Sequence, residues 1–182
     1  MLTTKVQDLG KWKSLSGNDV SLNGKVTVLG FPGYEIVKNR SNLFNLNLKI
    51  YQRYHSFADL QFVYVCPIGT EKEAQAIVDQ FAVFSDPSHY EFVFATPEEI
   101  QNFYNGLKLK GSLESDSGTP YVYLLDKERN LRGRKDDAEY KEGYNTFHIS
   151  EISNEMLDDF KVILYEYRAA LKKNNNASKR QI

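Results

Sequence analysis

Runs of residues typical of buried β-strands alternate with helical patterns along most of this chain, and that alternation restricts the fold more than any other feature. The strand-like runs are short and rich in β-branched and aromatic residues, and they cover residues 25–30, 60–66 and 91–95. Each is followed by a segment with apolar residues at three- and four-residue steps, at about residues 41–55, 70–81 and 96–107. Strands that alternate with helices imply a parallel sheet with helices on both faces. The sequence therefore predicts an α/β domain.

The pattern changes after residue 118, where a hairpin and a last helix are predicted. Residues 121–125 and 131–134 flank a polar turn, and an amphipathic stretch from Ser153 to Leu171 predicts the last helix. The intervening residues 135–152 mix charges and contain Gly143, so we expect a surface excursion there. The strands of a mixed sheet of about five are expected in the spatial order 91–95, 60–66, 25–30, 121–125, 130–134.

One domain with two polar ends accounts for the 182 residues. Residues 1–24 contain two β-like pieces around Trp12–Leu15 and Asp19–Leu22, which predict an N-terminal hairpin arm. The domain itself is expected to span residues 25–171. Residues 172–182 carry three consecutive asparagines and several basic residues, and we expect them to form a disordered tail.

The charge balance and the apolar pattern exclude several kinds of partner. The chain has 23 basic and 24 acidic residues, a formal charge of −1, so nothing favours nucleic acid, which needs clustered positive charge. No run of about 18 apolar residues is present, and the first residues lack the apolar core of an export signal. We expect a cytoplasmic location for the chain as given, and a periplasmic or membrane-anchored one if a leader or anchor has been removed.

Four local motifs, taken in order, are similar to a known family. Asn23–Leu29 resembles the Gly-Lys entry to a first core strand, and Phe62–Pro67 followed by Thr70 resembles the strand that leads into the second helix. Gly118–Tyr121 is similar to the Thr–cis-Pro that precedes the third core strand, and Leu124–Gly133 to the hairpin that follows. Together they resemble the thioredoxin fold in its redoxin form, closest to the Sco/SenC family. The resemblance covers about residues 20–171 and implies a thioredoxin-like three-layer sandwich.

The chain departs from this family at the residues that carry its chemistry. The family has a cysteine pair just after the first core strand, whereas Phe31–Val37 contains no cysteine. A Sco-type copper site also uses a histidine before the third core strand, and Asp116–Pro120 offers none. Disulfide exchange needs two thiols, and copper(I) needs soft sulfur donors. We therefore expect no metal and no cofactor, and a degenerate active site.

The resemblance also suggests where a partner would bind. In thioredoxin-like proteins the backbone beside the cis-proline can pair with an extended peptide, although an inherited turn would preserve Pro120 equally well. The apolar segment 31–37 is either a docking patch or a loop buried under residues 135–152. The predicted partner-binding residues are Phe31, Pro32, Gly33, Tyr34, Thr119 and Pro120.

Cys66 is the only cysteine and the only candidate nucleophile. It ends the second strand-like run, so the amides of the helix that begins at Thr70 would lower its pKa if the thiol were accessible. The alternative is a small buried apolar side chain. His55, His89 and His148 share no metal-ligand spacing and are expected on the surface.

Three functions remain open from the sequence. The first is a redox-inactive domain that binds an unknown protein or peptide through residues 31–37 and the Pro120 region. The second is a single-cysteine thiol oxidoreductase or redox sensor that uses Cys66. The third is an accessory to a membrane assembly, which the Sco-like resemblance would suit.

Overall fold

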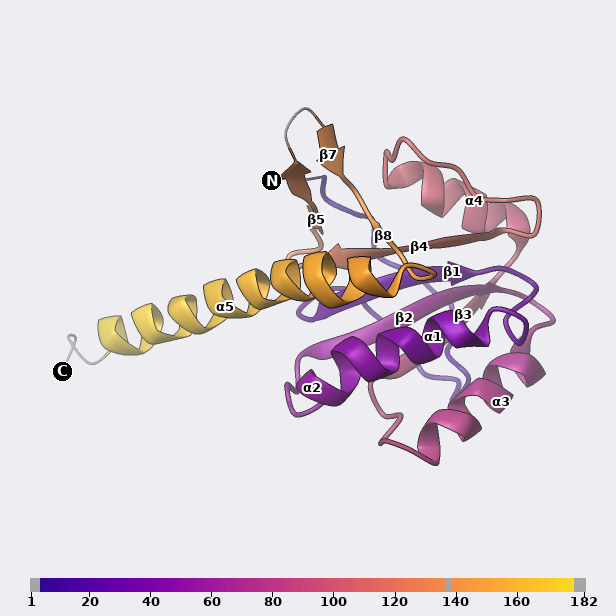
Figure 1. Cartoon of the computed structure of the whole chain (residues 1–182), viewed down its shortest axis with the longest axis horizontal. Coiled ribbons are helices and arrows are strands. Elements are labelled where there is room, and N and C mark those ends of the chain that lie inside the picture. The colour runs from indigo at the N-terminus through magenta and orange to yellow at the C-terminus, as the bar shows by residue number, and fades with distance from the viewer. Residues whose placement is uncertain (1–3, 137–138, 179–182) are drawn as a thin grey trace.

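The computed structural model describes residues 4–136 and 139–178, and a mixed sheet forms its centre (Figure 1). The strand order is β3-β2-β1-β4-β5, as the sequence predicted. β1, β2 and β3 pair in parallel, and β4 runs antiparallel to β1. The strands are β1 (Val26–Pro32), β2 (Leu60–Pro67), β3 (Tyr90–Ala95), β4 (Gly118–Leu125) and β5 (Leu131–Arg132).

Helices cover both faces of this sheet and create a separate apolar core on each. The helical segments are α1 (Arg40–Leu46), η1 (Asn47–Tyr51), α2 (Gln52–Tyr54), α3 (Glu71–Ala82), α4 (Pro97–Gly106), η2 (Glu151–Met156) and α5 (Leu157–Ser178). One core joins the sheet to α1, α3, η2 and α5, and the other joins it to α4 and the N-terminal segment. Alternate residues of each strand face opposite cores, as the pleat requires. The result is the predicted three-layer sandwich.

Two Thr-x-x-Glu patterns in the sequence, Thr70–Glu73 and Thr96–Glu99, predict capping boxes, and their outcomes differ. At the start of α4, Thr96 and Glu99 satisfy each other's backbone amides, as predicted. At the start of α3, the Thr70 side chain makes no cap hydrogen bond. Its hydroxyl instead donates to the Pro67 carbonyl oxygen at 2.8 Å, inside the protein. The Thr70 hydroxyl therefore stabilises the turn before α3 instead of capping the helix.

The N-terminal segment, which was predicted as a hairpin arm, packs its apolar side chains into the second core. Its two halves are joined by one antiparallel bridge, between Lys13 and Asp19. The Trp12 ring contacts Phe103 of α4 edge to face at a centroid distance of 5.4 Å. Four further apolar side chains of this segment are buried on the sheet: Val6, Leu9, Val20 and Leu22. Residues 1–3 lie outside the described part of the chain.

Residues 135–152 are not the surface excursion that the sequence predicted. β6 (Arg134–Asp136) pairs with β7 (Glu139–Lys141), and β8 (Tyr144–Asn145) adds to the central sheet by pairing with β4. Tyr144 and Ile152 are completely buried. This segment therefore supplies part of the core next to β4, while residues 137–138 lie outside the described residues.

The last helix is longer than predicted and takes in the start of the expected tail. α5 continues to Ser178, and Figure 1 shows its C-terminal turns extending away from the sheet. No proline or glycine occurs between Lys172 and Ser178 to stop the helix. Residues 179–182 lie outside the described residues. Within residues 4–136 and 139–178, no helix is long and apolar enough to cross a bilayer.

Candidate functional site

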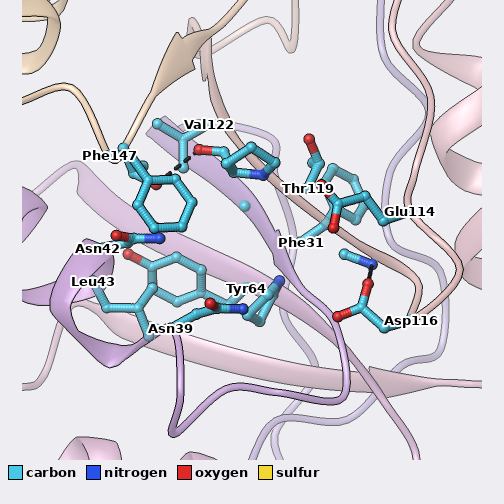
Figure 2. A pocket seen from close by; sticks show the side chains of 15 residues that line it. Phe31, Asn39, Asn42, Leu43, Tyr64, Glu114, Asp116, Thr119, Val122 and Phe147 are labelled. Atoms are coloured by element: carbon cyan, nitrogen blue, oxygen red, sulfur yellow. Dashed lines mark hydrogen bonds between the residues drawn. The ribbon is translucent and has the colours of Figure 1, made fainter.

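A pocket of about 90 Å³ opens where the C-terminal end of β1 meets the start of β4, at the Pro32–Gly118 pair. Figure 2 shows its walls, which come from β1, α1, β2, the loop before β4 and the segment after β8. The residues that line it are Gly30, Phe31, Pro32, Asn39, Asn42, Leu43, Tyr64, Glu114, Asp116, Gly118, Thr119, Pro120, Val122, Thr146 and Phe147.

Four of the six predicted partner-binding residues line this pocket, namely Phe31, Pro32, Thr119 and Pro120. Gly33 and Tyr34 form the adjacent turn. Gly33 has φ +68°, and a Cβ there would lie 2.7 Å from Asp116 Oδ2, so only glycine fits. The Tyr34 amide donates to the Asp116 carbonyl oxygen at 3.1 Å, and its ring is 47% exposed.

Segment 31–37 is half buried, with side chains in both cores of the sheet. Phe31 packs edge to face on Tyr104 of α4 and is 1% exposed. Ile36 is completely buried in the opposite core, to which α1, β1 and Tyr144 and Ile152 of residues 135–152 also contribute. Tyr34 and Val37 are the side chains of this segment that remain exposed as large apolar groups.

The Thr119–Pro120 peptide bond is trans, so the predicted cis-proline is wrong. With the trans bond, β4 runs without interruption from Gly118 to Leu125. The Pro120 carbonyl oxygen accepts two hydrogen bonds from Thr146, from the amide at 2.9 Å and the hydroxyl at 2.7 Å. The chain's own segment after β8 therefore occupies the backbone position that the resemblance assigned to a partner peptide.

Tyr64 of β2 lies in the pocket wall without a partner for its hydroxyl group. The residue is 1% exposed, and its Oη has no hydrogen-bond partner among the described residues. Burial raises the pKa of this phenol, so it stays protonated and keeps its proton to donate. A Cβ on Gly30 would lie 2.8 Å from the Tyr64 ring, so glycine at this position makes room for the ring. The sequence analysis did not identify Tyr64.

Cys66 is also completely buried, one residue before the end of β2. Burial raises the pKa of its thiol, and the negative charge of Glu71 raises it further. Its Sγ donates to the Tyr64 carbonyl oxygen at 3.6 Å. Desolvation thus outweighs the lowering of the thiol pKa that was expected from the amides of the following helix. This favours the alternative in which Cys66 is an inert, apolar side chain.

The three histidines differ in exposure. His55 and His148 are exposed as predicted, whereas His89 is partly buried and its Nδ1 has no hydrogen-bond partner among the described residues. No group of three or more histidine, cysteine, aspartate or glutamate side chains in residues 4–136 and 139–178 is arranged to hold a metal ion.

The lining of the pocket does not fit a copper ion, the metal that the resemblance to the Sco family implies. Segment 31–37 spans the end of β1 and the turn after it, where the family has its cysteines, and it has no sulfur. The polar atoms of the lining belong to hydroxyl, amide and carboxylate groups, which are hard donors. Copper(I) prefers thiolate and thioether sulfur.

Comparison with known proteins places the fold. No family model and no curated protein sequence matches the chain. BsSco, a member of the Sco family of cytochrome c oxidase assembly proteins, aligns with a TM-score of 0.64 and 15% identity, over 89% of this chain and 94% of that one. This chain has the thioredoxin-like fold.

Two further structures agree with this assignment. A thiol:disulfide interchange protein of the thioredoxin family from Chlorobium tepidum has a TM-score of 0.56 and 15% identity, over 87% of this chain and 96% of that one. ScoI of Arabidopsis thaliana with copper bound has a TM-score of 0.54 and 16% identity, over 88% and 99%. The resemblance to thioredoxin-like and Sco proteins is thus confirmed for the fold, in a chain with a single cysteine.

Proposed function

We propose that this thioredoxin-like domain is a redox-inactive binding module that holds a side chain of a protein partner in the pocket between β1 and β4. The observation that carries the proposal is the pocket itself. It lies directly after β1, where the family has its cysteine pair, and it has polar groups but no thiol in its lining. A concave site with a few convergent polar groups is the usual form of a binding site.

The mode of binding differs from strand addition. Thr146 already satisfies the Pro120 carbonyl oxygen, and Asn145 already pairs with Tyr121. An incoming strand would have to displace both, whereas a side chain can enter the pocket with β8 in place. We therefore propose side-chain recognition, with the exposed Tyr34, whose amide donates to Asp116 of the lining, as part of the contact surface.

The alternative of a Cys66 enzyme or sensor has no observation in its favour, because the thiol is buried and its pKa is raised. Association with a membrane assembly is a further proposal about the partner, in line with BsSco, which belongs to a family of cytochrome c oxidase assembly proteins. A location outside the cytoplasm would be needed for a periplasmic assembly.

Two measurements test the proposal. A photo-crosslinking amino acid at Tyr34 should capture a discrete partner in the cells that make the protein, while the same group at Tyr165, 74% exposed on α5, should not. Equal capture at both positions, or none at Tyr34, would refute the binding site. Reduction of a protein disulfide by dithiothreitol should proceed at the background rate, and a faster rate that Cys66→Ala abolishes would refute redox inactivity.

A further inference from the structure

The pocket combines unpaired polar side chains with acidic charge. The Tyr64 hydroxyl and the side-chain amides of Asn39 and Asn42 make no hydrogen bond with another described residue. Figure 2 shows the Tyr64 hydroxyl pointing toward the Asn42 side chain, which is itself buried. A buried hydroxyl is costly to leave unpaired, and the two side-chain amides are available to a ligand, so the pocket suits a polar occupant.

The charges of the lining have one sign. Glu114 and Asp116 contribute two carboxylates, and the lining contains no lysine, arginine or histidine. The Glu114 carboxylate has no hydrogen bond or ion pair with a described residue. In Figure 2 these two residues lie on the side of the pocket opposite Asn42. An occupant that spans the pocket therefore meets neutral acceptors at one end and carboxylates at the other.

The size of the pocket suits a group of several heavy atoms. A single water needs roughly 10–15 Å³ by this measure, and the pocket offers about 90 Å³. The Phe147 side chain, 58% exposed, provides a flat apolar surface among the lining residues.

We propose that this pocket receives the guanidinium group of an arginine side chain from the protein partner, an inference that rests on the proposed function. Guanidinium is planar and cationic, with five N–H donors and no acceptor. These donors match the phenolic oxygen of Tyr64, the amide oxygen of Asn42 and the carboxylate of Glu114. The plane of the group also stacks on an aromatic ring, here Phe147. A lysine ammonium presents three donors at one point and spans fewer of these acceptors.

Peptide titration of the whole protein tests the inference. The probes are capped pentapeptides with arginine, citrulline, lysine or leucine between pairs of glycines, followed by backbone amide NMR shifts up to about 10 mM peptide. The arginine peptide should shift amides of Asn42, Thr119 and Thr146. Citrulline, the neutral isostere, should bind about tenfold more weakly because the charge-assisted bonds are lost. Lysine should bind more weakly than arginine.

Variants connect the binding to the named groups. Glu114→Gln should weaken the arginine peptide about threefold, and Tyr64→Phe about fivefold, whereas Glu73→Gln on α3 should leave it unchanged. Equal binding of arginine and citrulline at the pocket would overturn the inference and leave the proposed function intact. No shift with any peptide would also overturn it, and the Tyr34 crosslinking experiment decides the proposed function separately.

Discussion

Removal of the Tyr64 hydroxyl should make the free protein more stable, an unusual result for a polar deletion in a core. In Tyr64→Phe the ring remains between Gly30 and the pocket, and only an oxygen without a described partner is lost. An unpaired buried hydroxyl costs about 1–3 kcal/mol. The lost oxygen also forfeits dispersion contacts of about 0.1–0.2 kcal/mol each. We expect a net gain of about 1 kcal/mol in the free energy of unfolding.

Tyr123→Phe provides the matched control on the other face of the sheet. Its hydroxyl shares a hydrogen bond of 2.9 Å with Tyr104, and both residues are buried. Deletion of one hydroxyl leaves the other unpaired, so this variant should lose about 1 kcal/mol. Both substitutions keep the aromatic ring and remove only the hydroxyl oxygen. The comparison therefore isolates the effect of whether that hydroxyl group is hydrogen-bonded.

Urea denaturation and thermal unfolding measure the difference. For a chain of this length, about 1 kcal/mol corresponds to a shift in Tm of roughly 2–4 °C, upward for Tyr64→Phe and downward for Tyr123→Phe. A loss of stability in Tyr64→Phe equal to that in Tyr123→Phe would show that the Tyr64 hydroxyl is already well paired in the free protein. The case for a pocket that needs a polar occupant would then fail.

Three further outcomes are expected. Cys66 should resist alkylation in the native protein and react only after denaturation; native labelling with a pKa below the usual value of about 8.5 would contradict its burial. Asp8→Ala should cost about 2 kcal/mol in urea, because Asp8 accepts hydrogen bonds from Ser21 at 2.6 Å and from two backbone amides. Burial alone would raise the pKa of Asp8, but these hydrogen bonds lower it overall. The wild type should therefore lose this contribution to its stability as pH falls below about 4, and Asp8→Ala should show no such loss. Burial lowers the pKa of His89, so its contribution to stability is complete above about pH 6.5 and is lost as pH falls further; His89→Gln should remove that decline, and His55→Gln should not.

The central sheet was predictable because its signals are local. Each buried strand is a continuous apolar run, and each following helix has a regular apolar face, so their alternation predicts that the first three strands are parallel. The capping box at Thr96 and Glu99 is likewise contained in four consecutive residues. Both features depend on neighbours in sequence.

The features that sequence reasoning missed depend on distant partners. β8 has two residues, and its pairing with Tyr121 and Val122 has no signature in the sequence around Tyr144. Thr70 carries a valid capping signal, yet the Pro67 carbonyl oxygen competes for its hydroxyl. The N-terminal segment is held by Asp8 and by contacts with α4 that no local pattern contains.

Tyr64 could have been singled out from the sequence by one observation. In β2 the residues Phe62, Tyr64 and Cys66 alternate on one face, toward the core that contains α1. A tyrosine in the middle of such a row brings a hydroxyl group into an apolar layer, where it needs a partner. That the hydroxyl lacks a partner among the described residues was not evident, because it depends on packing that forms only in the folded chain.

The thioredoxin-like fold places the end of β1, the start of α1 and the start of β4 together whatever residues they carry. In this chain segment 31–37 has no sulfur, and the space beside it is lined with phenol, amide and carboxylate groups. Thr146 also closes the backbone position at Pro120. Under the proposed function both features act in the same direction, because the first leaves no thiol for electron transfer at this place and the second blocks pairing with an incoming strand. Recognition then depends on the side chains that line the pocket, so a substitution such as Glu114→Gln should change partner choice without altering the fold.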